Sequence, residues 1–258
     1  MTDFSDDELD RYARHLVLPD IGGRGQAALK QARVAVIGAG GLGSPCLLYL
    51  AAAGVGQISV IDDDVVAVSN LQRQILFVTA DAGRGKADVA AQRLHALNRH
   101  VVITPVPVRI DVGNAGALLA GHDVIADGCD SFATRLAVAD AAQALRVPLV
   151  SGAVGPFDGQ VATFRGYAPD LPCYRCLVGD AHDRAAQSCA EAGVLGALTG
   201  VIGSLMALEV LRELAGFGNS LAGRLLLYDA LGARMRTVRL AKDPGCPGCG
   251  AEPAGGSL

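Results

Sequence analysis

The chain has 258 residues, 51% of them hydrophobic, and its 22 basic and 26 acidic residues leave a net charge of −4. This size and apolar content allow one large domain with a buried core, whereas the near-neutral balance gives no sign of a nucleic-acid-binding surface. The longest uncharged run, 192–208, is too short to span a membrane, and an acidic N-terminus with no apolar leader, in a chain with seven cysteines, indicates a cytoplasmic protein.

Strands and helices alternate through the first 151 residues. Ser5 followed by Glu8 forms a capping-box signal for a helix that runs to about Leu18. Apolar runs then predict strands at 33–37, 57–62, 101–108, 123–127 and 148–151, with helices at 42–53, 86–97, near 115 and at 131–145. Such alternation is typical of a Rossmann-like, doubly wound and mostly parallel sheet in the α/β class.

The pattern changes after Gly152. Strands are indicated at 160–164, 225–228 and 235–240, interrupted by a long loop and an apolar helix at 193–214. We expect these strands to be antiparallel extensions of the same sheet, so that residues 1–250 form a single nucleotide-binding domain and 251–258 a flexible tail. Small residues along the apolar helix suit packing against a second copy of the chain, and equally suit burial within one subunit.

A glycine-rich turn joins the first strand of this sheet to the following helix. Residues 34–44 read VAVIGAGGLGS, which places Gly38, Gly40, Gly41 and Gly43 in a G-x-G-x-x-G pattern. Glycine there permits a sharp turn and close approach of a phosphate to the helix N-terminus. Asp62 ends the next strand, at the position of a carboxylate that binds a ribose hydroxyl. These residues predict a nucleotide site but do not separate NAD from ATP, and a tight turn with a capping Asp remains the alternative.

A group of polar residues beyond the second strand favours ATP. Asn70, Arg73, Gln74 and Lys86 provide more cationic and amide groups than hydride transfer needs, whereas charge that develops as a triphosphate is cleaved requires such groups. Asp130 follows another strand and offers a hard oxygen ligand for Mg²⁺. Any one of these residues alone could be a solvated charge or a helix cap; their occurrence together indicates ATP.

Four cysteines form two C-x-x-C pairs, in PCYRCL and GCPGCG. Cys173 with Cys176 and Cys246 with Cys249 match the spacing of a tetrahedral Zn²⁺ site. Four protein ligands leave no position for water, so this zinc would be structural. Two redox dithiols, or unpaired reduced thiols, are the alternatives.

The same motifs resemble, in order along the chain, the MoeB/ThiF family of ubiquitin-activating-like adenylyltransferases. The resemblance covers about Leu9 to Gly250 and is carried by the following segments: RYARH at 11–15, GAGGLGS, SNLQRQ at 69–74, Lys86, CYRCL, SCAEAGV at 188–194 and GCPGCG. SNLQRQ and the paired cysteine motifs are far more specific than the glycine turn.

The resemblance implies ATP-dependent adenylation of the C-terminal Gly-Gly carboxylate of a small ubiquitin-like sulfur-carrier protein. It implies that the glycines and Asp62 bind the nucleotide, that Asp130 with Ser131 lies at the Mg²⁺ site, and that Arg14 reaches the active site of the other subunit in a homodimer. The triphosphate would be held by four residues: Asn70, Arg73, Gln74 and Lys86. A cysteine desulfurase or rhodanese would supply sulfur for molybdopterin, thiamine or a related thio-cofactor.

At two positions this chain differs from the usual family sequence, and at a third position the role of the residue stays open. The family usually has Asn where Ser131 stands, and often Pro where Gly85 precedes the lysine. Cys189 matches a cysteine that some members link covalently to the carrier and others do not need, so it is either a catalytic thiol or a loop residue without a role. A tRNA threonylcarbamoyladenosine dehydratase of the same superfamily, an NAD-dependent oxidoreductase and a non-catalytic scaffold are the alternative functions, and the identity of the carrier stays open.

Overall fold

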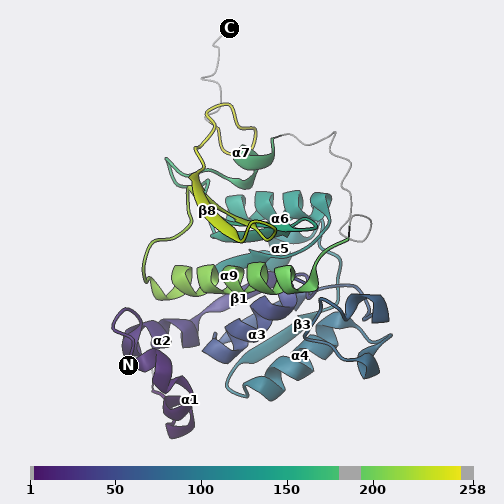
Figure 1. Cartoon of the computed structure of the whole chain (residues 1–258). Coiled ribbons are helices and arrows are strands. Elements are labelled where there is room, and N and C mark those ends of the chain that lie inside the picture. The colour runs from purple at the N-terminus through teal and green to yellow at the C-terminus, as the bar shows by residue number, and fades with distance from the viewer. Residues whose placement is uncertain (1–2, 180–192, 251–258) are drawn as a thin grey trace.

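The computed structural model describes residues 3–179 and 193–250. Within these residues the strands form one sheet in the order β3-β2-β1-β4-β5-β6-β7-β8 (Figure 1). The strands are β1 (Arg33–Ile37), β2 (Gln57–Ile61), β3 (Val102–Val106), β4 (Val124–Asp127), β5 (Leu149–Val154), β6 (Asp158–Phe164), β7 (Arg224–Asp229) and β8 (Arg234–Arg239). Strands β1 to β5 pair in parallel and β6 to β8 are added antiparallel, which confirms the expected fold class.

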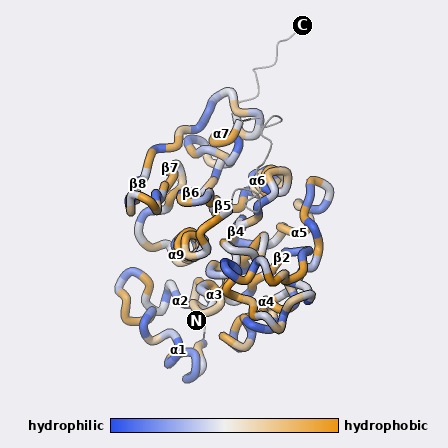
Figure 2. The backbone as a smooth tube through the Cα atoms, turned by 45° about the vertical axis from the view of Figure 1, so that its right-hand side comes forward, coloured by the Kyte–Doolittle hydropathy of each residue, from blue (hydrophilic) through white to orange (hydrophobic). Residues whose placement is uncertain are grey.

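Helices cover both faces of this sheet. The helices are α1 (Asp6–Leu16), α2 (Gly22–Gln31), α3 (Gly43–Ala53), α4 (Lys86–Leu97), α5 (Ala115–Leu119), α6 (Phe132–Leu145), α7 (Tyr174–Val178) and α9 (Gly196–Ala215), with short 3₁₀ turns η1 (Val68–Asn70) and η2 (Thr79–Asp81). Along β1, Val34 and Val36 join a core with α3, α4 and α9, whereas Ala35 and Ile37 join a core with α5 and α6. Most residues of the parallel strands are therefore apolar, as Figure 2 shows for β5 beside α9.

Helix α9 confirms the expected apolar helix, which starts three residues later than predicted. Its buried side, including Ile202 and Met206, packs within the subunit, while Val201 and Leu208 are exposed. No described helix is both long and apolar enough to cross a membrane. The expected tail, 251–258, lies outside the described residues.

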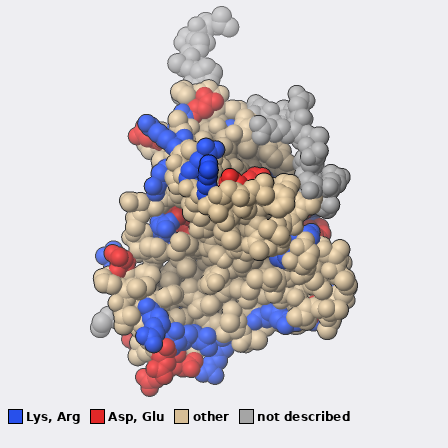
Figure 3. Space-filling model, viewed as in Figure 1, with Lys and Arg blue, Asp and Glu red and all other residues tan. Residues whose placement is uncertain are grey.

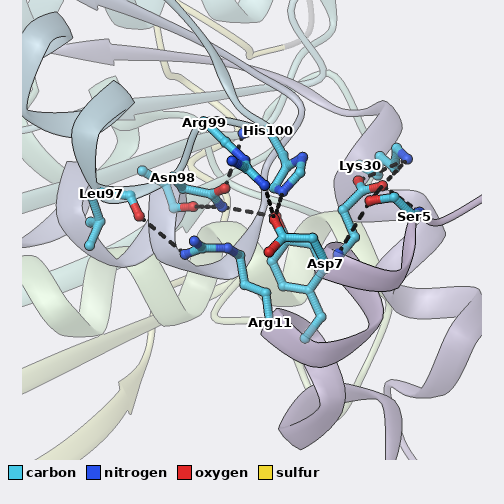
Figure 4. Close-up of polar contacts among 11 residues, drawn as sticks. Ser5, Asp7, Arg11, Lys30, Leu97, Asn98, Arg99 and His100 are labelled. Carbon is cyan, nitrogen blue, oxygen red and sulfur yellow. Dashed lines mark hydrogen bonds and ion pairs between the residues drawn. The ribbon is translucent and has the colours of Figure 1, made fainter.

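The N-terminal helix α1 is attached to the rest of the molecule by polar contacts (Figure 4). Ser5 and Glu8 form the predicted capping box. Asp7 pairs with Arg99 and His100, and the Arg11 guanidinium donates to the carbonyl of Leu97. Because these partners lie at the end of α4 and just after it, α1 is held against the turn that leads into β3.

Helix α2 was not among the predicted elements. Its sequence, GGRGQAALKQ, contains three glycines, which disfavour a helix. Tertiary contacts compensate: Leu29 is fully buried, and the buried Gln26 donates to the carbonyl of Ala53 and contacts His15. Local propensity is therefore overridden by packing.

The turn between β1 and α3 requires glycine at two positions. Gly38 has a φ of +84°, in the left-handed region that disfavours side chains. A Cβ placed on Gly43 would lie 1.8 Å from the Gly38 carbonyl oxygen, a rigid backbone atom. The turn can be this tight only without a side chain at Gly43.

We therefore expect Gly43→Ala to lower the thermal unfolding midpoint strongly or to prevent folding, because backbone must move to relieve the overlap. Gly116→Ala is the matched control, since Gly116 is also helical but a Cβ there meets nothing within 4 Å. Thermal unfolding followed by circular dichroism compares the two. Equal midpoints for both variants and the unsubstituted chain would contradict this description of the turn.

Candidate functional site

A cavity of about 280 Å³ opens where the carboxyl ends of β1, β2 and β4 meet. In the sheet, β1 lies between β2 and β4, and the strand order runs in opposite directions on the two sides of β1. Ligands of open α/β sheets bind at the carboxyl ends of the strands where the order reverses in this way. The structure brings most of the predicted site residues to the lining of this cavity: Gly38, Gly40, Gly41, Asp62, Arg73, Gln74, Lys86, Asp130 and Ser131.

Asp62 connects the end of β2 to the glycine turn. Its carboxylate accepts hydrogen bonds from the backbone N–H of Ala39, at 2.7 Å, and of Asp64, at 2.9 Å. Burial raises the pKa of Asp62, while the nearby Lys86 charge and the two backbone donors oppose that rise. The carboxylate is thus presented at the cavity wall in a fixed orientation, suited to accept a hydroxyl hydrogen bond.

Lys86 supplies a nearly buried ammonium group at the start of α4. Its side chain is 6% exposed, and Nζ lies 2.8 Å from Oδ2 of Asp64, whose own side chain is 65% exposed. The cation is therefore enclosed while its counter-ion is largely in solvent. An anion entering the cavity can compete with Asp64 for this ammonium group.

Gln74 and Arg73 follow the turn η1. Gln74 is buried, its amide nitrogen faces Gly40, and its Oε1 has no hydrogen-bond partner among the described residues. A buried amide oxygen without a partner is costly, so this atom is available to a ligand or water donor. Arg73 donates to the carbonyl of Ser69 at 3.2 Å and remains partly exposed at the cavity.

Asp130 follows β4 and has an exposed carboxylate that lines the cavity. Its neighbours are held in place: the N–H of Cys129 donates to Asp127 at 3.1 Å, and the Ser131 hydroxyl caps α6 by accepting from the N–H of Thr134 at 3.3 Å. An exposed carboxylate on an ordered turn suits a Mg²⁺ ion, which prefers oxygen ligands. Ser131 thus acts as a helix cap at a position where its hydroxyl also reaches the cavity wall.

Three predicted residues do not line the cavity, and a fourth is outside the described part of the chain. Gly43 is packed in the turn and does not line the cavity, and Asn70 contributes its carbonyl, which accepts from the N–H groups of Arg73 and Gln74. Arg14 is exposed on α1, outside the cavity lining. Cys189 lies outside the described residues.

Two arginines that were not predicted from the sequence line the same cavity. Arg109 follows β3 and lies 3.7 Å from Asp63 at the rim. Arg135 is buried beneath the cavity in α6, beside Asp127. A charged residue in the apolar segment ATRLAVADAA was the available signal for Arg135, whereas nothing local distinguishes Arg109 from a surface charge.

The four cysteines come together at a second place, on α7 and the final described segment. Sγ of Cys173 lies 3.5 Å from that of Cys246, Sγ of Cys176 lies 3.4 Å from that of Cys249, and all four sulfur atoms lie within 4.8 Å of one another. Four thiolates around a zinc ion with bonds of about 2.3 Å would have sulfur atoms about 3.8 Å apart. The cluster therefore fits a tetrahedral metal ion.

Comparisons with known proteins agree with this geometry. The model of the ThiF family matches residues 12–248. A sulfur carrier protein adenylyltransferase from Thermus thermophilus is 52% identical over 253 residues, covering 96% of this chain and 93% of that protein. A molybdopterin-synthase adenylyltransferase from Escherichia coli is 42% identical, covering 97% of this chain and 100% of that protein. A crystal structure of E. coli MccB with ATP shares the fold, with a TM-score of 0.82 at 21% identity over 93% of this chain and 74% of that one.

Proposed function

The chain belongs to the ThiF family, and we propose that it uses ATP to adenylate the C-terminal carboxylate of a small ubiquitin-like sulfur-carrier protein ending in Gly-Gly. The observation that carries this proposal is the convergence of the glycine turn, Lys86, Arg73 and Asp130 on one cavity. Residues 1–250 would act as a single adenylation domain. The activated carrier would then receive sulfur from a cysteine desulfurase or rhodanese, for molybdopterin, thiamine or a related thio-cofactor.

The reaction is a displacement at phosphorus. A carboxylate oxygen of the carrier attacks the α-phosphorus of ATP, the bond to the β-phosphate oxygen breaks, and pyrophosphate leaves with the negative charge. The glycine turn leaves room for the phosphates, and Asp62 accepts from the ribose. Arg73 and Lys86 stabilise the charge that develops on the leaving group, with Gln74 orienting it. Asn70 supports Arg73 and Gln74 through its carbonyl, which accepts from the N–H groups of both.

Asp130 would hold Mg²⁺, which when bound neutralises charge on the phosphates. The fit rests on its exposed carboxylate at the cavity and on the ordered turn around it. Ser131 has no amide to offer the nucleotide, so any contact from this position comes from its hydroxyl. The role of Cys189 is a separate proposal, in which its thiol sulfur attacks the carbonyl carbon of the acyl-adenylate, AMP leaves with the electron pair of the broken bond, and the carrier becomes bound as a thioester.

Arg14 would complete the site of a second subunit. It is exposed on α1, and it forms no ion pair within the described part of the chain. The face on which α9 lies is largely uncharged (Figure 3). Exposed apolar residues of α3 and α9 include Tyr49, Val201 and Leu208. The uncharged face at α9, together with an exposed Arg14 that has no ion pair among the described residues, supports a homodimer in which Arg14 crosses to the partner.

The cysteine cluster would bind one structural Zn²⁺ through Cys173, Cys176, Cys246 and Cys249. Backbone N–H groups of Asp243 and Gly248 donate to Sγ of Cys176 and Cys246, as they would to metal-bound sulfur atoms. The metal would tie the last described segment to α7.

Replacing Arg73 or Lys86 with Ala should lower the rate of carrier-dependent exchange between pyrophosphate and ATP by roughly 10²-fold or more, the scale for losing one preorganised donor. Arg33→Ala is the matched control, since Arg33 is exposed at the opposite end of β1. Exchange rates like those of the unsubstituted enzyme in both site variants would place the chemistry elsewhere.

Arg14→Ala and Asp130→Ala should each be inactive alone, because one lacks the donated cation and the other the metal ligand. Mixing them with subunit exchange should restore activity, since each mixed dimer contains one site with both groups. With half of the dimers mixed and independent sites, about a quarter of the normal activity is expected. No recovery despite exchange demonstrated by mass spectrometry would mean that Arg14 serves its own subunit.

Protein purified without chelator should contain one zinc per chain by elemental analysis. Cys246→Ser should lose most of this zinc and unfold at a lower temperature, because the end of the chain is no longer attached to α7. The structural zinc would be ruled out if the purified protein contained no metal, if the thiols of these four cysteines titrated freely, and if Cys246→Ser left the unfolding midpoint unchanged.

A further inference from the structure

Two fully buried side-chain amides lie between helix α1 and the end of α3. They belong to Gln26 of α2 and to Asn98, the residue that directly follows α4 (Figure 4). Burying an amide costs free energy unless its donors and its acceptor find partners. Both amides find partners in the same two elements, α1 and α3, and so they connect one to the other.

Asn98 uses both of its amide hydrogens for this connection. Its Nδ2 donates to the hydroxyl of Tyr12, on α1, at 2.8 Å and to the carbonyl of Ala51, in the last turn of α3, at 2.7 Å. Its Oδ1 accepts from the N–H of His100 at 3.2 Å. The Tyr12 ring is 3% exposed and packs on Gly54, where a Cβ would lie 2.4 Å from the ring carbon Cζ. The ring therefore needs a glycine directly after α3.

Gln26 makes the equivalent connection one turn further along α1. Its Nε2 donates to the carbonyl of Ala53, the last residue of α3, at 2.9 Å, and its Oε1 lies 2.9 Å from Nδ1 of His15. Because an amide oxygen can only accept, Nδ1 of His15 carries the hydrogen of this bond. The last carbonyls of a helix have no partner within it. The two amides thus satisfy carbonyls at the end of α3 and hold α1 against them.

Arg14 lies between these two anchored residues in the sequence and points away from them. Tyr12 and His15 are three residues apart, so they share one face of α1, whereas Arg14 is turned by about 100° from His15. Arg14 is accordingly exposed. Since α3 begins at the glycine turn and ends at this anchor, one helix connects the phosphate-binding turn of a subunit to the arginine that the subunit would donate.

We propose that Tyr12 and His15, held by Asn98 and Gln26, are positioning residues, which fix the direction in which α1 presents Arg14 to the partner subunit. This inference rests on the proposed function, because it needs Arg14 to act across a homodimer. A cation stabilises developing charge only while it is held in place. Without the two anchors, α1 keeps only the polar contacts of its first two turns, and the guanidinium spreads over more positions.

The test uses a mixed dimer in which only one site can react. One subunit carries Asp130→Ala, so the reacting site lies in the other subunit and receives Arg14 from the Asp130→Ala subunit. The anchor variant, Tyr12→Phe with His15→Ala, loses both contacts to α1 but leaves both amides bonded to α3, and it is introduced into either subunit in turn. Two affinity tags isolate the mixed dimer. Exchange between pyrophosphate and ATP is measured at saturating ATP, with the Gly-Gly carrier that the unsubstituted enzyme adenylates.

The exchange rate should fall roughly tenfold when the anchor variant lies in the subunit that donates Arg14, and hardly at all when it lies in the subunit whose site reacts. Both arrangements contain the same substitutions once each, so a general loss of stability or of dimer affects them alike. Unfolding midpoints and the dimer fraction, measured on both, check this. Equal rates in the two arrangements would overturn the inference, and so would a loss confined to the subunit whose site reacts.

Tyr167→Phe with His95→Ala is the matched control, because Tyr167 packs beside Arg146 and His95 is exposed on α4, both outside this anchor. The control should give equal rates in the two arrangements. If the anchor variant does not fold, His15→Ala alone, at a half-buried residue, takes its place, and a smaller difference in the same direction is expected.

Failure of the proposed function gives a different result from failure of this inference. Arg14→Ala, introduced into the Asp130→Ala subunit, should abolish exchange in the mixed dimer. If exchange persists, Arg14 does not act across the dimer and the proposed cross-subunit site is wrong. If Arg14→Ala abolishes exchange from that subunit alone, yet the anchor variant gives equal rates in both arrangements, only the positioning role of Tyr12 and His15 is removed.

Discussion

The site depends on the close packing of two backbone turns at the end of the parallel sheet. A Cβ on Gly38 would lie 3.3 Å from the nitrogen of Cys129, and a Cβ on Gly128 would lie 3.3 Å from the nitrogen of Gly43. The glycine turn after β1 and the turn after β4 are therefore in direct contact, and an added Cβ on Gly128 would also lie 3.1 Å from Cβ of Leu42. This contact sets the spacing between the phosphate-binding turn and Asp130, and a larger residue at any of these glycines would separate them.

Around this contact, charges are arranged so that the cavity can accept a polyanion. Lys86 is enclosed with only a largely exposed carboxylate as its partner, Arg73 lies at the edge, and the buried Gln74 oxygen lacks a donor among the described residues. Among the described residues, neither the antiparallel strands β6 to β8 nor the cysteine cluster contributes to the lining. The antiparallel strands instead pack against α6 and α7, since Phe164 and Leu225 share a core with Val138 and Tyr174.

Local signals in the sequence predicted much of this arrangement. The glycine spacing with flanking apolar runs predicted the turn, and the C-x-x-C pairs predicted a cluster that the folded chain brings together. Helix α2 was missed because its glycines oppose a helix that only contacts such as those of Leu29 stabilise. Arg135 was missed because its partners come from 6 to 17 residues away and from two other strands, so no local pattern reveals that one side chain joins them.

The most direct test of the account is the covalent product itself. The purified chain is mixed with ATP, Mg²⁺ and each candidate carrier in turn, and the carrier is examined by intact mass spectrometry, beside the same carrier lacking its final glycine. The account predicts that one carrier gains the mass of a single AMP group only when ATP, enzyme and the terminal glycine are all present. ATP binding without AMP transfer to any Gly-Gly carrier, or AMP transfer that does not depend on the terminal glycine, would contradict it.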